Sequence, residues 1–286
     1  MSAIEKVVAE EIAKAISRHL MDMPAGGQVS APVFSNTGLA GKIAYTLLKA
    51  DATEEQIAEL CEDAVKYGFS TVCVNSAFVS EAAKRLQFTS VGISSVVGFP
   101  LGAAGTQAKV AEAVEAVQNG ASEIEMVAHV GMIKSGNWRY YKNDIEEVQR
   151  ALGGRARLHV IIETSLLNDA EKFKACMICR LIGVDAVKTS TGFSAAGATT
   201  SDVRLLREAA GEDVKVIASG GIHTQEEAEA LLKAGADSIG TANGIAVVTG
   251  VPAQDSGGHI CVGCGSCRQA GGCPTGRVDF IVANNY

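Results

Sequence analysis

The sequence lacks the features of a membrane, secreted or nucleic-acid-binding protein. No apolar run approaches the ~18 residues that cross a bilayer, and the N-terminus has no ordered basic, apolar and small-residue regions of a secretory signal. Lysine and arginine number 25 against 32 acidic residues, and the resulting net charge of −7 disfavours a nucleic-acid partner. These absences predict a cytoplasmic protein that binds neither membrane nor nucleic acid.

The composition also lacks a signature of disorder. Apolar residues make up 47% of the 286 residues and charged residues 20%, so the chain has ample material for a core. A chain of this length forms one large domain or two ordinary ones.

Short apolar runs alternate with helical patterns between residues 41 and 250. The expected strands are residues 42–47, 71–74, 92–97, 123–127, 158–163, 186–189, 214–218 and 238–240. Helical patterns begin near Thr53, Ser80, Thr106, Tyr140, Asp169, Ser201 and Gln225. Eight strands that alternate with helices predict an α/β fold, a (β/α)₈ TIM barrel in preference to an open doubly wound sheet.

One lysine stands inside a short apolar strand. Lys188 is followed by small hydroxyl residues and a glycine, among them Thr191 and Gly192, which are candidates for substrate binding. Burial penalises a charged amine and lowers its pKa, and a partly neutral lysine attacks carbonyl carbons to form a Schiff base. The alternative is an edge-strand lysine in water. A place near the C-terminal end of the sixth strand favours the nucleophile, because barrel enzymes keep their chemistry there.

A carboxylate is expected near this lysine. Glu123 and Glu125 share one face of the fourth strand, because side chains alternate along a strand. If that face points inward, Glu125 can move protons around a carbinolamine. The alternative is a rim glutamate paired with a surface lysine. Thr46 and Asn75 end the first two strands and either orient a hydroxyl-bearing substrate or form turns.

Glycine-rich turns follow the last two strands. Backbone N–H groups in such turns close on an anion, and a following helix N-terminus adds its dipole. Barrels of this kind often bind phosphate after strands seven and eight. The candidates are Gly220, Gly221 and His223 in the first turn and Gly240 and Asn243 in the second.

Eight segments between residues 43 and 248, in order, resemble the deoxyribose-phosphate aldolase family of class I aldolases. They are YTLLK (45–49), VCVN (72–75), VGFPLG (97–102), GASEIEMV (120–127), VIIET (160–164), VKTSTGFS (187–194), ASGGI (218–222) and IGT (239–241). The resemblance implies a barrel that cleaves 2-deoxyribose 5-phosphate into acetaldehyde and glyceraldehyde 3-phosphate without a cofactor. It also implies that Lys188 is the Schiff-base lysine and that Glu125 replaces the family's proton-transferring aspartate. We expect a homo-oligomer.

Several positions depart from the family pattern. Ala44 stands where the family has an aspartate, and Ile217 where it has a second lysine whose charge lowers the nucleophile's pKa. Lys215 lies on the same face, one layer deeper, and is expected to reach up and substitute, unless it faces solvent. In the phosphate turns, His223 stands where an arginine is usual, and Asn243 belongs to a pair that replaces two serines.

Three functional hypotheses follow from these residues. The first is a Schiff-base aldolase that acts on 2-deoxyribose 5-phosphate or a similar phosphorylated sugar or aldehyde. The second is a catalytically degenerate barrel that serves as a scaffold or a redox-linked binding module, which Ala44 and Ile217 favour. The third is a class I aldolase of altered substrate specificity, for which His223 and Asn243 are the candidates.

An amphipathic helix is expected to precede the barrel. An apolar stripe within residues 1–22 lies opposite charged positions, and residues 23–40 have the composition of a flexible linker. The helix either folds back onto the barrel or docks on a partner. Its helix-plus-linker form resembles the encapsulation peptides of enzymes packaged in bacterial microcompartments, which makes a microcompartment shell an expected partner.

The tail of residues 251–286 carries four of the eight cysteines. Such clustering in a chain without a secretory signal favours metal ligation over disulfides. The spacing suits an iron–sulfur cluster; structural zinc and no metal are the alternatives. Retro-aldol cleavage needs no electron, so a cluster would be structural, regulatory or a contact to a redox partner. The candidate ligands are Cys261, Cys264, Cys267 and Cys273.

Overall fold

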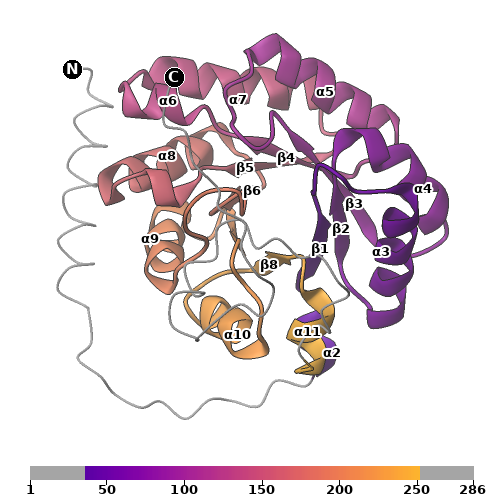
Figure 1. The fold of residues 1–286 in the computed structure, drawn as a ribbon. Helices are drawn as coiled ribbons and strands as arrows, with labels where there is room; N and C mark the ends of the chain where they lie inside the picture. Colours follow the sequence, from indigo (N-terminus) through magenta and orange to yellow (C-terminus); the bar gives the residue numbers. More distant parts are fainter. Residues whose placement is uncertain (1–35, 252–286) are drawn as a thin grey trace, which may run out of the picture.

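The computed structural model describes residues 36–251, which form a closed barrel of eight parallel strands (Figure 1). Each strand pairs with its neighbours in sequence, and the first strand pairs with the last. Helices connect successive strands on the outside of the barrel. The predicted (β/α)₈ TIM barrel is therefore confirmed.

The strands are β1 (Ile43–Leu47), β2 (Thr71–Val74), β3 (Gly92–Val97), β4 (Glu123–Val127), β5 (Arg157–Ile161), β6 (Ala186–Lys188), β7 (Lys215–Ser219) and β8 (Ser238–Thr241). The α-helices are α2 (Asn36–Ala40), α3 (Glu54–Tyr67), α4 (Val79–Leu86), α5 (Thr106–Gln118), α6 (Val130–Lys134), α7 (Trp138–Leu152), α8 (Asp169–Ile182), α9 (Thr200–Ala210), α10 (Gln225–Lys233) and α11 (Gly244–Thr249). Short 3₁₀ turns span Ser76–Phe78 and Thr164–Leu166. None of the helices between residues 36 and 251 is long and apolar enough to cross a membrane.

The folded unit begins before residue 41, where the sequence placed its start. Helix α2 lies against α11, and Leu39 and Ala40 are buried in the hydrophobic core (Figure 1). The predicted linker therefore ends in a helix, because its last residues bury apolar side chains. The predicted helix within residues 1–22 and the four candidate ligand cysteines of the tail lie outside the described residues.

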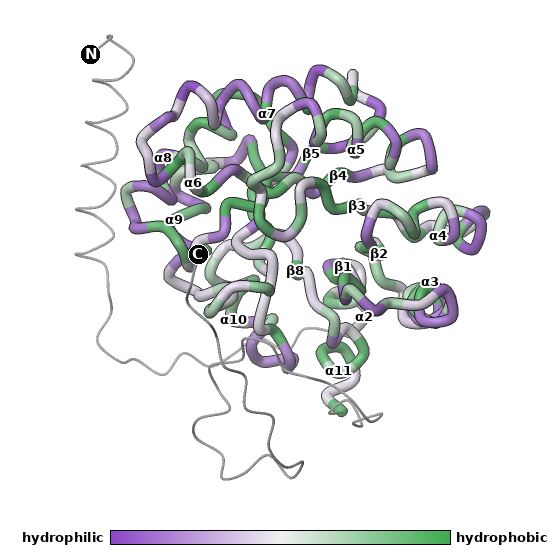
Figure 2. Tube along the Cα trace, turned by 45° about the horizontal axis from the view of Figure 1, so that its top comes forward, coloured by the Kyte–Doolittle hydropathy of each residue, from purple (hydrophilic) through white to green (hydrophobic). Residues whose placement is uncertain are grey.

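The hydrophobic core lies between the barrel and its helices. Outward-facing strand residues such as Val72, Ile124, Val160 and Val216 are fully buried there, and Figure 2 shows hydrophilic stretches on outer helices such as α3, α4 and α7. The inner faces of the strands are different. There the strand register aligns buried polar side chains: Cys73, Ser94, Glu123, Glu125, His159 and Lys188. The apolar core thus stabilises the fold from outside, while the interior of the barrel holds a group of buried polar side chains among apolar ones such as Val96 and Ile217.

A buried ion pair joins helices α5 and α7. The Lys109 ammonium donates hydrogen bonds to an Asp144 carboxylate oxygen at 2.7 Å and to the carbonyl of Val127, the last residue of β4, at 3.0 Å. Thr106 donates its hydroxyl to the other Asp144 oxygen at 2.7 Å. Both charged side chains are at most 1% exposed. The pair therefore fixes the C-terminal end of β4, the strand that carries Glu125.

We expect Lys109→Met to destabilise the fold strongly, because it leaves the Asp144 carboxylate buried without its cation. Breaking one side of such a pair costs about 3–5 kcal/mol, and the free energy of unfolding in urea measures the loss. Lys142→Met is the matched control, since Lys142 pairs with Glu146 at the surface with 48% of its side chain exposed and should cost less than about 1 kcal/mol. Equal losses in the two variants would contradict a structural role for the buried pair.

Candidate active site

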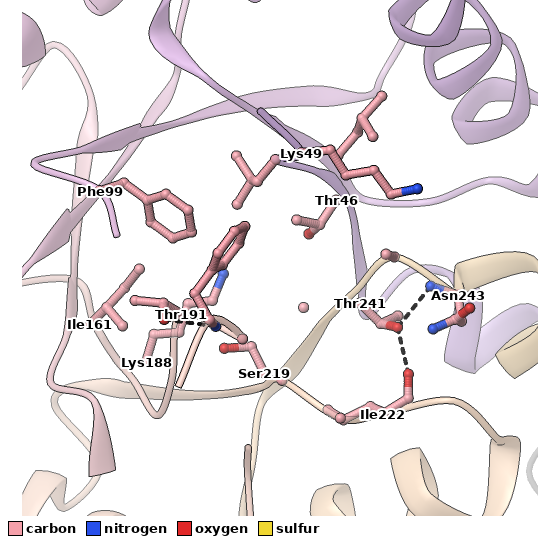
Figure 3. A pocket seen from close by; sticks show the side chains of 18 of the residues that line it. Thr46, Lys49, Phe99, Ile161, Lys188, Thr191, Ser219, Ile222, Thr241 and Asn243 are labelled. Carbon is pink, nitrogen blue, oxygen red and sulfur yellow. Dashed lines mark hydrogen bonds between the residues drawn. The ribbon is translucent and has the colours of Figure 1, made fainter. Parts of the chain in front are cut away.

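A cavity of about 210 Å³ opens where the strands end at their C-termini. Its walls come from the ends of β1, β6, β7 and β8 and the turns that follow them (Figure 3). Nine of the predicted site residues line it: Thr46, Lys188, Thr191, Gly192, Gly220, Gly221, His223, Gly240 and Asn243. In Figure 3, Lys188 lies on one side of the cavity, and Thr241 and Asn243 lie on the other. The cavity therefore has a lysine end and a glycine-turn end.

Lys188 and Glu125 form a buried ion pair beside the cavity. The Lys188 Nζ lies 2.5 Å from Oε2 of Glu125, and the two side chains are 4% and 2% exposed. The Cys73 thiol lies 3.4 Å from the same carboxylate oxygen. Burial is the largest single influence and acts to lower the pKa of the Lys188 amine, but Glu125, together with Cys73 and Glu123, outweighs it and raises the pKa above the ordinary value. The expectation of a partly neutral lysine is therefore wrong for the resting site, because the ion pair reverses the effect of burial.

The pKa of the Glu125 carboxyl is lowered in turn. Burial acts to raise it, but the Lys188 ammonium beside it, with a hydrogen bond from Cys73, prevails. The resting pair is therefore an ammonium and a carboxylate that share a hydrogen bond. A proton has to move from Lys188 to Glu125, or beyond it, before the amine can attack a carbonyl.

An apolar residue stands beside the nucleophile on β7. Ile217 pairs with Lys188 in the strand register and is 5% exposed. Lys215 does not take up the role proposed for it, because it is the first residue of β7, has an exposed side chain and does not line the cavity. On β8, a Cβ at Gly240 would lie 3.1 Å from the Lys188 Nζ, so glycine leaves room around the amine.

The two glycine turns are tied to each other by hydrogen bonds. The Thr241 hydroxyl donates to the carbonyl of Ile222 at 2.7 Å and accepts from the backbone N–H of Asn243 at 2.9 Å (Figure 3). The Asn243 amide nitrogen lies 2.9 Å from Nδ1 of His223. Gly220 has a φ of 87°, a left-handed conformation that favours glycine. The turns thus form one connected wall of the cavity.

Glu163 is a site residue that the sequence analysis missed. It is 3% exposed, has a left-handed φ of 55°, and accepts hydrogen bonds from the backbone N–H and the hydroxyl of Thr191. The Thr191 hydroxyl accepts a further bond from the N–H of Phe193 at 3.1 Å. Glu163 therefore holds the loop that forms one wall of the cavity. Its position at the C-terminal end of the expected fifth strand, residues 158–163, was the signal that could have identified it.

Asn75 does not line the cavity; it directly follows β2 and precedes the 3₁₀ turn Ser76–Phe78. Between residues 36 and 251, no three His, Cys, Asp or Glu side chains converge as ligands for a metal ion. The predicted ligands Cys261, Cys264, Cys267 and Cys273 lie outside this range.

Comparison with known proteins identifies relatives over the barrel. Residues 44–251 match the model of the DeoC/LacD family aldolases. A deoxyribose-phosphate aldolase of Clostridium kluyveri is 49% identical over 210 residues, which are 73% of this chain and 96% of that protein. One from Lactococcus lactis is 46% identical over 214 residues, 75% of this chain and 97% of that protein.

A solved structure agrees with these relatives. The tetrameric deoxyribose phosphate aldolase from Aeropyrum pernix is 30% identical, with a TM-score of 0.70 over 82% of this chain and 96% of that one. With a buried lysine and carboxylate at the cavity and this similarity along the whole barrel, the chain belongs to the DeoC/LacD family of aldolases, which are carbon–carbon lyases.

Proposed function

We propose that this chain is a Schiff-base aldolase that cleaves 2-deoxyribose 5-phosphate, or a similar phosphorylated sugar, into acetaldehyde and glyceraldehyde 3-phosphate. The observation that carries the proposal is the Lys188 amine, hydrogen-bonded to Glu125 at 2.5 Å and facing the cavity. The names of the relatives support this substrate.

The reaction begins with proton transfer within the ion pair. Glu125 takes a proton from Lys188, the neutral amine attacks the aldehyde carbon of the open-chain sugar, and Glu125 returns the proton to the carbinolamine oxygen, which leaves as water. The resulting iminium accepts electrons from the C2–C3 bond as a base removes the proton of the C3 hydroxyl. Glyceraldehyde 3-phosphate departs, and protonation of the enamine at C2 followed by hydrolysis releases acetaldehyde and restores Lys188.

The phosphate is assigned to the glycine-turn wall of the cavity. Backbone N–H groups around Gly220 and Gly221 are suited to an anion, and His223 lines the same wall. Lys49 also lines the cavity and can add positive charge. In this arrangement the phosphate and the aldehyde carbon occupy opposite ends of one cavity.

Two other functions remain as candidates, each favoured by a specific residue. Ile217 supplies no charge to lower the pKa of Lys188, which favours a catalytically degenerate scaffold or redox-linked binding module. His223 and Asn243, 2.9 Å apart, replace the family's usual phosphate ligands and favour an aldolase of altered substrate specificity.

The assembly and location of the protein are also proposals. The tetrameric relative from Aeropyrum pernix supports a homo-oligomer. The protein is proposed to be cytoplasmic, with residues 1–22 as a docking segment for a microcompartment shell. The tail cysteines are proposed to hold an iron–sulfur cluster or zinc, on the basis of their spacing alone.

Borohydride trapping tests the Schiff base directly. With 2-deoxyribose 5-phosphate or acetaldehyde near neutral pH, we expect a reduced adduct on Lys188, detected by intact mass and peptide mapping. Lys188→Ala should give none. A folded wild-type protein that forms no adduct with either carbonyl at any pH would exclude the aldolase and leave the scaffold.

Ile217→Lys distinguishes a weakened enzyme from one with a different substrate. Its Cα is the strand partner of Lys188, about 4.8 Å away, so a second ammonium should lower the pKa of the Lys188 amine. We expect kcat/KM for 2-deoxyribose 5-phosphate near neutral pH to rise about tenfold. Ile217→Met is the neutral control of similar length. No gain with this sugar, together with efficient cleavage of another, would favour altered specificity.

Glu125→Gln separates the two roles of the carboxylate. Without the Glu125 carboxylate, burial dominates, and the pKa of Lys188 should fall below the ordinary value of 10.5. NMR titration of the labelled Lys188 amine measures this pKa. Turnover should nevertheless fall about 100-fold, because no group returns the proton to the carbinolamine. Glu125→Asp should restore part of the activity. An unchanged lysine pKa in Glu125→Gln would show that the ion pair does not control the nucleophile.

A further inference from the structure

A row of ionisable side chains continues below the active site, inside the barrel. Glu125 on β4 and His159 on β5 are strand partners whose side chains share the inner face. Two residues earlier on each strand lie Glu123 and Arg157, which form an ion pair. The mechanism above uses only the uppermost group of this row, Glu125.

His159 lies beside Glu123 and is the strand partner of Glu125. It is 6% exposed, its Nδ1 is 3.9 Å from Oε2 of Glu123, and that nitrogen has no hydrogen-bond partner among the described residues. Strand partners in neighbouring parallel strands stand about 4.8 Å apart, so the imidazole is also within reach of the Glu125 carboxylate. A buried imidazole nitrogen without a hydrogen-bond partner, close to carboxylates, can take up a proton.

Charged groups on three strands determine whether the His159 imidazole is protonated. Burial lowers the pKa of His159; Glu123 and Glu125 act to raise it, and Lys188 and Arg157 act to lower it. The ammonium of Lys188 is therefore one reason why the imidazole is neutral in the resting protein. Once the nitrogen of Lys188 loses its charge, that repulsion disappears and both carboxylates remain to stabilise an imidazolium.

The charges of the row remain balanced when the proton moves. In the resting state Arg157 and Lys188 are positive, Glu123 and Glu125 are negative, and the sum is zero. A proton that leaves Lys188 for Glu125 and then passes to His159 leaves two cations and two anions again. A buried interior strongly disfavours net charge, so this transfer is compatible with the site.

We propose that His159 is a positioning residue of the Schiff-base cycle, which holds the proton given up by Lys188 whenever the lysine nitrogen is neutral. In the first step, the N–H bond of Lys188 breaks, an O–H bond forms on Glu125, and the same proton then forms an N–H bond on His159. Glu125 is left ionised beside a neutral amine, and the proton returns from His159 through Glu125 to the carbinolamine oxygen when water leaves. The inference rests on the proposed aldolase function and addresses a need peculiar to this chain, since Ile217 brings no cation to neutralise the amine by repulsion.

The test measures the rate of borohydride-trapped adduct formation with acetaldehyde from about pH 5 to about pH 9. In His159→Gln, a side chain that holds no proton in this range, we expect the acidic limb to shift upward by about one pH unit and the rate near pH 7 to fall about tenfold. His129→Gln is the matched control, because His129 does not line the cavity and should retain the wild-type profile.

A second variant keeps the test decisive if His159→Gln does not fold. Glu123→Gln removes the anion that would hold the imidazolium and leaves Arg157, whose side chain is 55% exposed, in contact with solvent. Its profile should shift in the same direction. If both variants fold and their pH profiles match that of His129→Gln, while the wild-type protein forms its normal adduct, the role of His159 is overturned and the proposed function is not. No wild-type adduct at any pH would overturn the proposed function, and this inference with it.

Discussion

The buried hydrogen-bonded ion pair between Lys188 and Glu125 is the interaction on which the rest of the site depends. Either charge alone in the interior of the barrel would carry a large desolvation penalty, and only the presence of the other allows both to be nearly inaccessible to water. The closed barrel supplies the geometry, because β4 and β6 are both neighbours of β5. The pair that makes the lysine tolerable inside the protein also keeps it protonated, so the amine is held in its charged form.

The barrel can hold this ion pair because the residues that stabilise the fold and the residues of the candidate site lie on opposite faces of the strands. The apolar core lies outside the strands, where outward-facing residues such as Val160 and Val216 pack against the helices. Polar residues on the inner faces therefore do not interrupt that core. An outer helix also fixes a strand of the site, because Lys109 on α5 donates a hydrogen bond to the last carbonyl of β4. A protein organised in this way can keep an ionisable interior without loss of a continuous hydrophobic core.

Much of this arrangement could be predicted from the sequence because strand patterns determine it. The apolar runs gave eight strands, and period-two alternation put Glu125 on the same face as Glu123. The same rule failed for Lys215, which shares a face with Ile217 but stands at the very start of β7, where the barrel opens to solvent. Alternation identifies the face of a strand but not the depth of a residue in the barrel.

Other features depend on contacts between strands, which a linear pattern does not contain. The pKa of Lys188 was expected to fall because burial is visible in an apolar run, whereas its 2.5 Å contact with a carboxylate two strands away is not. His159 escaped notice for the same reason. It is a polar residue with apolar neighbours on either side, and only its pairing with Glu125 on the neighbouring strand indicates a role.

The interior of the barrel also bears on the choice between an enzyme and a scaffold. A buried ion pair contributes little stability compared with apolar side chains of similar size, and a left-handed glutamate carries backbone strain of about 1–3 kcal/mol. A scaffold requires neither feature. Here Lys188 of the ion pair lines the cavity. The strained Glu163 accepts a hydrogen bond from Thr191, whose loop forms part of the cavity wall. Ile217 brings no charge next to Lys188, but the costly features around the lysine are those that the proposed reaction at Lys188 requires.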